Sequence, residues 1–144
     1  MTGTAYLDAS GAMRMLLRGR AGHRAALQVL HEADDVATVT LTYAEVCGAL
    51  AAARRDRALT GPGLVRALEQ WEGLWAQVAP VVVDEPLART AGELARVHAL
   101  RGVDAVHLAA AQATGSELLL SADRQLCAAA QQYGIAIIDL DRAP

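Results

Sequence analysis

The sequence predicts an α/β protein, a three-layer sandwich in which helices cover both faces of a mainly parallel sheet of about five strands. Two observations predict this class. Short apolar runs alternate along the chain with longer segments of helical periodicity, and the runs are continuous rather than alternating in polarity. Continuous runs are typical of parallel strands that are covered on both faces. We interpret residues 1–144 as one domain, because no linker or repeat divides them.

The predicted strands are short, and acidic residues close two of them. Asp8 ends the first run, and Asp84 ends the third, which we expect to be a buried strand. The strands are predicted at 5–7, 36–40, 81–83, 118–120 and 135–138. Functional sites in such sheets lie beyond the carboxyl ends of the strands, so the residues that follow these runs are the first candidates.

The segments between the strands have the periodicity and the end signals of helices. Pro86 lies near the first turn of one segment, and Gly115 and Gly134 end two others. Another segment carries Trp71 and Trp75 on its apolar stripe, where packing in the core, in a dimer or against a partner remains open. The helices are predicted at 11–18, 21–33, 43–57, 64–78, 87–98, 104–114 and 123–133.

Composition excludes several classes of protein. The formal net charge of −3 argues against a non-specific nucleic-acid coat protein. None of the 13 basic residues is lysine, which excludes a Walker A phosphate loop and Schiff-base chemistry. Cys47 and Cys127 form no CxxC pair, so we expect buried, reduced thiols in a cytoplasmic protein. No apolar run is long enough to span a membrane, and the first residues do not resemble a signal peptide.

Four of the 16 acidic residues lie among apolar or small neighbours rather than on a polar face: Asp8, Glu45, Asp104 and Asp123. Two follow predicted strands, and two lie at the starts or first turns of predicted helices. All four could therefore face the same edge of the sheet. A helix cap is the alternative for each acid. For Glu45 the alternative is a first-turn position in a capping box with Thr42.

Together the four carboxylates have the chemistry of a divalent-cation site. Mg²⁺ and Mn²⁺ prefer hard oxygen ligands in octahedral geometry and keep several waters. A cation held there would lower the pKa of a water molecule and stabilise charge on a phosphodiester. Nothing else in the chain offers comparable chemistry, since it contains neither a GxSxG nucleophile elbow nor histidines at HxxxH spacing.

At these four places the sequence resembles the PIN-domain family, and specifically the VapC-type toxin ribonucleases of bacterial toxin–antitoxin pairs. The resemblance is carried, in the order of the family, by residues 6–10, 42–46, 100–109 and 121–126. The Asp-Ala-x-His-Leu-Ala stretch that begins at Asp104 is the most specific segment. The sequence departs from the family at Val103, where some members carry a further acid, and at Ala122, a position that is often aromatic.

The resemblance implies a PIN-like fold and an endoribonuclease that depends on Mg²⁺ or Mn²⁺. It implies that Asp8 and Asp104 ligate the cation directly, and that Glu45 and Asp123 ligate it through water or orient the nucleophile. It also implies a homodimer, and a cognate VapB-type antitoxin that covers the pocket and keeps the RNA substrate out.

Three further residues are predicted to contact substrate. Ser10 matches the small hydroxyl residue that the family has beside its first acid, and Ser121 stands where the family often has Thr or Ser. Arg14, where many members have lysine, is expected to contact an RNA phosphate, although a solvated helix face is the alternative. We expect His107 to be a packed helix histidine with both ring nitrogens satisfied rather than a metal ligand.

A second function is open: a catalytically silent PIN-like module that binds RNA or a protein partner. The complete set of four acids favours the nuclease. A phosphatase of the haloacid-dehalogenase type is disfavoured, because that chemistry needs an Asp-x-Asp pair and Asp8 is followed by Ala9 and Ser10.

Overall fold

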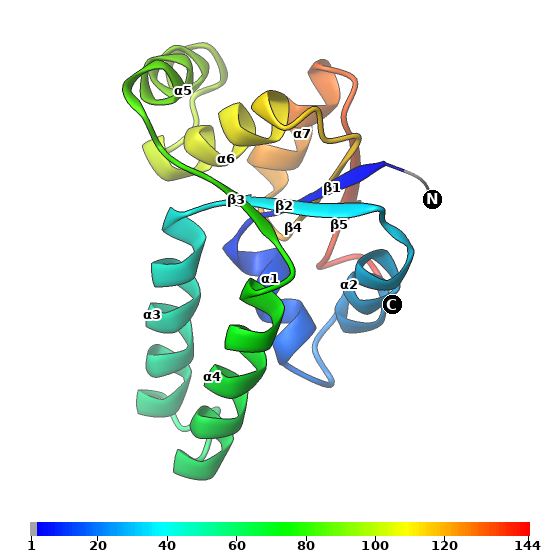
Figure 1. Ribbon diagram of the computed structural model, residues 1–144, viewed down its shortest axis with the longest axis vertical. Helices are drawn as coiled ribbons and strands as arrows, with labels where there is room; N and C mark the ends of the chain where they lie inside the picture. The colour runs from blue at the N-terminus through cyan, green and yellow to red at the C-terminus, as the bar shows by residue number, and fades with distance from the viewer. Residues whose placement is uncertain (1–2) are drawn as a thin grey trace.

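The computed structural model describes residues 3–144 as one five-stranded sheet with helices on both faces (Figure 1). The strands are β1 (Thr4–Leu7), β2 (Asp35–Val39), β3 (Ala79–Val81), β4 (Leu118–Ser121) and β5 (Ala136–Asp139). The helices are α1 (Ala9–Leu16), α2 (His23–Glu32), α3 (Leu41–Arg55), α4 (Gly61–Trp75), α5 (Glu85–His98), α6 (Gly102–Ala113) and α7 (Arg124–Gln132). The predicted fold class is confirmed. None of these helices is long and apolar enough to cross a membrane.

The order of the strands creates a natural position for a binding site. The sheet has the order β3-β2-β1-β4-β5, and every pair of neighbours is parallel. From the central strand β1 the chain proceeds to β2 and β3 on one side, and later to β4 and β5 on the other. The carboxyl ends of β1 and β4 therefore form the switch point, where open α/β sheets bind ligands.

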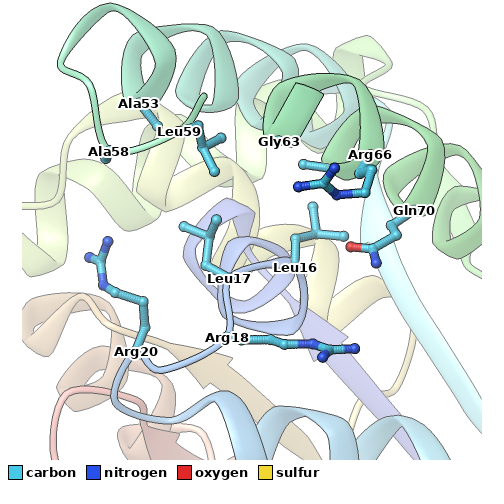
Figure 2. Close-up of a pocket in the computed structure, with 11 residues that line it drawn as sticks. Leu16, Leu17, Arg18, Arg20, Ala53, Ala58, Leu59, Gly63, Arg66 and Gln70 are labelled. Atoms are coloured by element: carbon cyan, nitrogen blue, oxygen red, sulfur yellow. The ribbon is translucent and has the colours of Figure 1, made fainter. Parts of the chain in front are cut away.

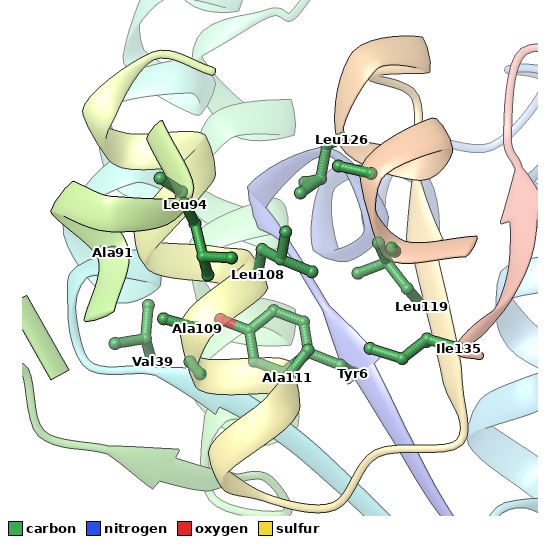
Figure 3. Packing of buried hydrophobic residues seen from close by; sticks show 14 of the residues in the cluster. Tyr6, Val39, Ala91, Leu94, Leu108, Ala109, Ala111, Leu119, Leu126 and Ile135 are labelled. Carbon is green, nitrogen blue, oxygen red and sulfur yellow. The ribbon is translucent and has the colours of Figure 1, made fainter. Parts of the chain in front are cut away.

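Both faces of the sheet are buried, which explains the continuous apolar runs in the sequence. Tyr6 of β1 belongs to the core beneath α5, α6 and α7, whereas Ala5 and Leu7 belong to the core beneath α1, α2, α3 and α4. Figure 3 shows Tyr6 against α6, beside Ala109 and Ala111. Successive residues of a strand point to opposite faces, so a central strand covered on both faces is apolar throughout.

The third predicted strand is wrong in its position and in its burial. β3 ends at Val81 rather than continuing to residue 83, and the side chain of Val82 is 66% exposed. β3 pairs only with β2 and lies at an edge of the sheet. Pro80 cannot donate a backbone hydrogen bond, so it fits an edge strand. This proline was the feature of the sequence that could have indicated the edge position of β3.

The expectation of a buried thiol is confirmed for Cys127 and is wrong for Cys47, which is only partly buried. Burial raises the pKa of the Cys127 thiol to about 12, so this thiol stays protonated at neutral pH. Trp71 is buried in the core beneath α1–α4 and stacks on Tyr43, and Trp75 packs against both rings. Core packing accounts for Trp71, and the partly exposed Trp75 stays available for a contact with another chain.

The close approach of α1 to β4 depends on Gly11. A Cβ atom at this position would lie 2.9 Å from the backbone oxygen of Leu120, too close for any real contact. The same glycine donates its backbone N–H to Asp8 Oδ1 at 2.9 Å. Gly11 therefore sets how closely Asp8, at the start of α1, approaches the end of β4.

We expect Gly11→Ala to destabilise the protein by about 1–3 kcal/mol, because the backbone of β4 cannot move aside without disturbing the sheet. Gly92→Ala is the matched control, since Gly92 lies on an exposed turn of α5 with open space around it. That change should stabilise the protein by up to about 1 kcal/mol. Urea denaturation measures both, and a Gly11→Ala variant as stable as the wild type would refute the tight packing.

Candidate active site

The structure brings the four acidic residues together in one pocket of about 320 Å³ at the carboxyl ends of β1 and β4. Asp8 directly follows β1, Asp123 follows β4, Glu45 lies on α3 and Asp104 lies in the first turn of α6. The remaining residues that line the pocket are Ala9, Ser10, Arg101, His107 and Ala122. Residues far apart in the sequence thus meet at the switch point of the sheet.

Asp8 is a buried carboxylate that is held by neutral donors. It is 5% exposed. Its Oδ1 accepts hydrogen bonds from the Ser10 hydroxyl at 2.6 Å and from the Gly11 backbone N–H at 2.9 Å, and its Oδ2 accepts one from the Ser121 hydroxyl. Burial raises the pKa of Asp8, although nearby His107 and these hydrogen bonds act in the opposite direction. No ion pair involves Asp8 among residues 3–144.

Two of the acids are helix caps as well as pocket residues. Asp8 caps α1 through Gly11, and Asp123 caps α7 by accepting from the Leu126 backbone N–H at 3.0 Å. The capping alternative is therefore correct for both, and it is compatible with a place in the pocket. The cap fixes the carboxylate at a helix N-terminus, which is favourable for a negative charge.

The capping alternative is wrong for Glu45. Helix α3 begins at Leu41, so Thr42 lies inside the helix and Glu45 lies beyond the first turn. The hydroxyl of Thr42 is buried and accepts a hydrogen bond from Thr38 at 2.7 Å instead. Glu45 Oε1 accepts from Nε2 of His107 at 2.8 Å.

The capping alternative is also wrong for Asp104. The residue in the N-cap position of α6 is Arg101, and Asp104 lies within the first turn. Asp104 Oδ2 accepts a hydrogen bond from Nε of Arg101 at 2.9 Å, and the arginine side chain is largely exposed at the pocket. A guanidinium group of the protein itself therefore pairs with one of the carboxylates.

Arg101 and His107 are the pocket residues that sequence reasoning did not place. His107 was expected to be packed with both ring nitrogens satisfied, and this is confirmed, since Nδ1 lies 2.8 Å from the Tyr6 hydroxyl oxygen. One of its partners, however, is Glu45 of the pocket. The available signal was the spacing of both residues from Asp104, because positions three apart share a helix face.

The two serines act differently from what was expected. Ser10 lines the pocket, donates to Asp8 and accepts from the Ala122 backbone N–H at 2.9 Å. Ser121 is fully buried, donates to Asp8 and accepts from the Asp123 backbone N–H at 2.9 Å. Both hydroxyls thus orient acids of the pocket, and a contact with substrate is open to Ser10 alone.

Arg14 lies away from the pocket. Its guanidinium donates to the backbone oxygens of Ala21 at 2.5 Å and Leu140 at 3.3 Å, and it pairs with Asp141 at 2.6 Å. This hydrogen bond lowers the pKa of Asp141. The side chain ties α1 to the segment that follows β5, so the structure gives its predicted contact with an RNA phosphate no support.

The pocket suits a hydrated divalent cation. In residues 3–144 no three His, Cys, Asp or Glu side chains are arranged to hold a metal ion directly. Each carboxylate is instead held by a donor of the protein. Mg²⁺ keeps several of its waters and commonly binds through one or two carboxylates, so a set of three direct ligands is not required. The buried charge of Asp8, which only neutral donors satisfy, is what such a cation would neutralise.

Comparison with known proteins identifies the class. A family model of the PIN domain matches residues 5–132, and the chain belongs to this family. Ribonuclease VapC45 of Mycobacterium tuberculosis (strain CDC 1551 / Oshkosh) is 41% identical over 134 residues, covering 92% of each chain. Ribonuclease VapC49 of strain H37Rv matches with the same values.

Solved structures share the fold at lower identity. The toxin VapC20 of Mycobacterium tuberculosis, described as cleaving the sarcin–ricin loop, has a TM-score of 0.67 at 22% identity over 87% of this chain and 94% of that one. A toxin–antitoxin complex from Klebsiella pneumoniae has a TM-score of 0.62 at 21% identity over 86% and 90% of the two chains. The expected family and fold are thereby confirmed.

We expect Asp8→Asn to raise the melting temperature in EDTA near neutral pH. Because burial raises the folded-state pKa of Asp8, the folded protein binds this proton more tightly than the unfolded chain does. The stability that protonated Asp8 contributes is therefore complete below the pKa of this group in the unfolded chain, and it is lost as the pH rises through its pKa in the folded protein. The asparagine side chain does not ionise, so the variant should be more stable than the wild type near neutral pH and equally stable at acidic pH.

Scanning calorimetry from pH 3 to pH 8 measures this difference in melting temperature. We expect a difference of about 5 °C at pH 7. Asp56→Asn is the matched control, since Asp56 is exposed and should give no such gain. An Asp8→Asn variant that is less stable than the wild type at pH 7 would contradict the electrostatic description of the pocket.

Proposed function

We propose that this protein is the toxin endoribonuclease of a type II toxin–antitoxin pair, and that it hydrolyses RNA phosphodiester bonds at the pocket of Asp8, Glu45, Asp104 and Asp123. The observation that carries this proposal is the gathering of four carboxylates at the switch point of a PIN-domain sheet. The 41% identity to two proteins named ribonucleases supports the reaction class.

Asp8 and Asp104 are the residues that would hold Mg²⁺ or Mn²⁺, because they are the two buried carboxylates of the pocket, at 5% and 8% exposure. When bound, a divalent cation supplies an acidified water and charge neutralisation at the phosphodiester. Asp8 is fixed in advance by Ser10, Ser121 and Gly11, so it needs little reorganisation.

Glu45 and Asp123 are the candidates for proton transfer and for orientation of the attacking water. Glu45 is 26% exposed, so its carboxylate can reach both the pocket and solvent. Asp123 is half-buried at the start of α7, where it faces the pocket from the β4 side. A base must lie within hydrogen-bond reach of the proton that it takes, and both residues line the same small pocket.

Arg101 is placed to respond to occupancy of the pocket. Its guanidinium pairs with Asp104, the residue that would ligate the cation. With Asp104 committed to a cation, the Arg101 guanidinium would lose this partner and could hold an RNA phosphate at the rim. In this description the arginine that contacts the substrate is Arg101 rather than Arg14.

The antitoxin is the proposed partner of a second surface, shown in Figure 2. A groove of about 650 Å³ lies between the end of α1 and the α3–α4 pair. Leu16, Leu17 and Leu59 line its apolar part, and Arg18 and Arg66 lie around it. An amphipathic antitoxin segment with acidic flanks complements this groove in polarity and in charge. The toxin–antitoxin complex among the structural neighbours supports a partner of this kind.

The same proposal includes the oligomeric state and the location of the protein. We expect a homodimer in the cytoplasm, in which the exposed Val82 and Val83 at the β3 edge are available for a contact between copies. Sedimentation equilibrium of the free toxin tests the dimer, and a monomer at micromolar concentration would refute it.

We expect the purified protein to cleave RNA with Mg²⁺ or Mn²⁺ and to lose at least about 100-fold in rate in EDTA or as Asp104→Asn. The substrate is total RNA, and sequencing of the fragment ends identifies the cleavage site. The exposed Glu69→Gln variant should keep the wild-type rate. A folded, metal-loaded and antitoxin-free protein that cleaves no RNA pool would favour the alternative, a catalytically silent module that binds RNA or protein.

We expect Arg18→Glu combined with Arg66→Glu to weaken antitoxin binding by about tenfold or more, which corresponds to ~1.4 kcal/mol. RNA cleavage by the free toxin should be unchanged, because neither residue lines the acidic pocket. Arg89→Glu combined with Arg96→Glu on α5 is the charge-matched control. Titration calorimetry with the antitoxin measures both pairs, and equal effects of the two double variants would exclude the groove.

A further inference from the structure

We propose that His107, fixed in place by Tyr6, is a positioning residue that holds the Glu45 carboxylate in the pocket. This inference rests on the proposed nuclease function and adds to it a side chain that touches neither the cation nor the RNA. Nothing in the sequence motif by itself requires this histidine to act through an acid on another helix.

The three side chains form one continuous chain of hydrogen bonds. The Tyr6 hydroxyl oxygen lies 2.8 Å from His107 Nδ1, and His107 Nε2 lies 2.8 Å from Glu45 Oε1. Tyr6 is fully buried and His107 is 2% exposed, so neither has water as an alternative partner. The two rings meet edge to face, with centroids 5.8 Å apart and an interplanar angle of 72°. The imidazole ring therefore has one orientation.

The direction of the hydrogen bonds follows from what each partner can donate. A carboxylate only accepts hydrogen bonds, so Glu45 requires a proton on Nε2 of His107. The Tyr6 hydroxyl donates to Nδ1, which leaves the proton of the neutral ring on Nε2. That N–H points at Glu45, so the tautomer that Tyr6 selects is the one that the glutamate requires.

Glu45 needs such a partner more than the other acids do. Asp8 and Asp123 are fixed by helix caps, and Asp104 is fixed by Arg101. Within residues 3–144, His107 provides the one hydrogen bond that Glu45 receives. A glutamate side chain has several rotatable bonds, and at 26% exposure it would otherwise turn toward solvent.

The arrangement also couples Glu45 to the two proposed cation ligands. Tyr6 lies on β1, the strand that Asp8 follows, and His107 lies on α6, the helix that carries Asp104. The same two elements that place Asp8 and Asp104 thus determine the position of Glu45 on α3. An error in the packing of α6 against β1 would displace all three carboxylates together.

The test compares His107→Leu, His107→Gln and Tyr6→Phe with the wild type, and it repeats His107→Leu in a Glu45→Gln background. The readouts are kcat and KM on an RNA oligonucleotide and the affinity for Mn²⁺ alone, measured by electron paramagnetic resonance. The melting temperature of each variant checks folding. His98→Leu and Tyr133→Phe are the matched controls, because these residues form a second His–Tyr hydrogen bond of 2.7 Å outside the pocket.

We expect His107→Leu to lower kcat by about 10- to 100-fold and to weaken Mn²⁺ binding, with KM changed less than about twofold. In the Glu45→Gln background the same change should have almost no further effect, because the histidine acts through that carboxylate. Glutamine retains an N–H donor, so His107→Gln should recover part of the loss. Tyr6→Phe should give a smaller loss of the same kind, and both control variants should match the wild type.

An equal loss from His107→Leu with and without Glu45→Gln would overturn the proposal, because a merely structural histidine gives additive effects. Unchanged kcat and Mn²⁺ affinity in folded His107→Leu would also overturn it. If His107→Leu does not fold, Tyr6→Phe and His107→Gln decide by the same criteria. A wild type that binds Mn²⁺ and cleaves RNA while the His107 variants match it refutes this inference alone. A wild type that does neither refutes the proposed function as well.

Discussion

The buried carboxylate of Asp8 is the constraint on which the rest of the site depends. An ionised carboxylate removed from water is costly unless hydrogen bonds or a cation stabilise it. Here Ser10, Ser121 and the start of α1 supply hydrogen bonds, while no cation of the described chain pairs with it. The protein therefore holds a negative charge in an arrangement that a bound divalent cation would complete. The other carboxylates are arranged around this one.

The topology of the sheet makes this arrangement possible. Asp8 and Asp123 follow adjacent strands, β1 and β4, so one pair of parallel strands delivers two acids to the same edge. Gly11 permits α1 to lie against β4, and this contact brings the Ser121 hydroxyl to Asp8. Helices α3 and α6 then supply Glu45 and Asp104 from opposite faces of the sheet. The carboxyl edge of the sheet thus serves both the fold and the site. Asp8 and Asp123 line the pocket and also cap helices α1 and α7.

Much of this could be predicted from the sequence, since it follows from local patterns. Continuous apolar runs predicted the parallel sheet, and acids among apolar neighbours predicted which carboxylates would gather. The edge position of β3 was missed, because a run of three valines has the same composition at an edge as in a centre. Arg101 lies three residues before its partner Asp104, so that pair is local. The partners of Arg14 and His107 could not be predicted, because Asp141 and Glu45 are brought to them by the packing of whole elements. In particular, the Tyr6–His107 contact joins residues 101 positions apart.

The most direct test of the account is a crystal structure of the protein with Mn²⁺, in which anomalous scattering locates the ion. The account predicts an anomalous peak in the pocket lined by Asp8, Glu45, Asp104 and Asp123, with the Arg101 side chain displaced from Asp104. It would be contradicted by a fully occupied Mn²⁺ elsewhere on the protein while this pocket stays empty and the Arg101–Asp104 pair is intact.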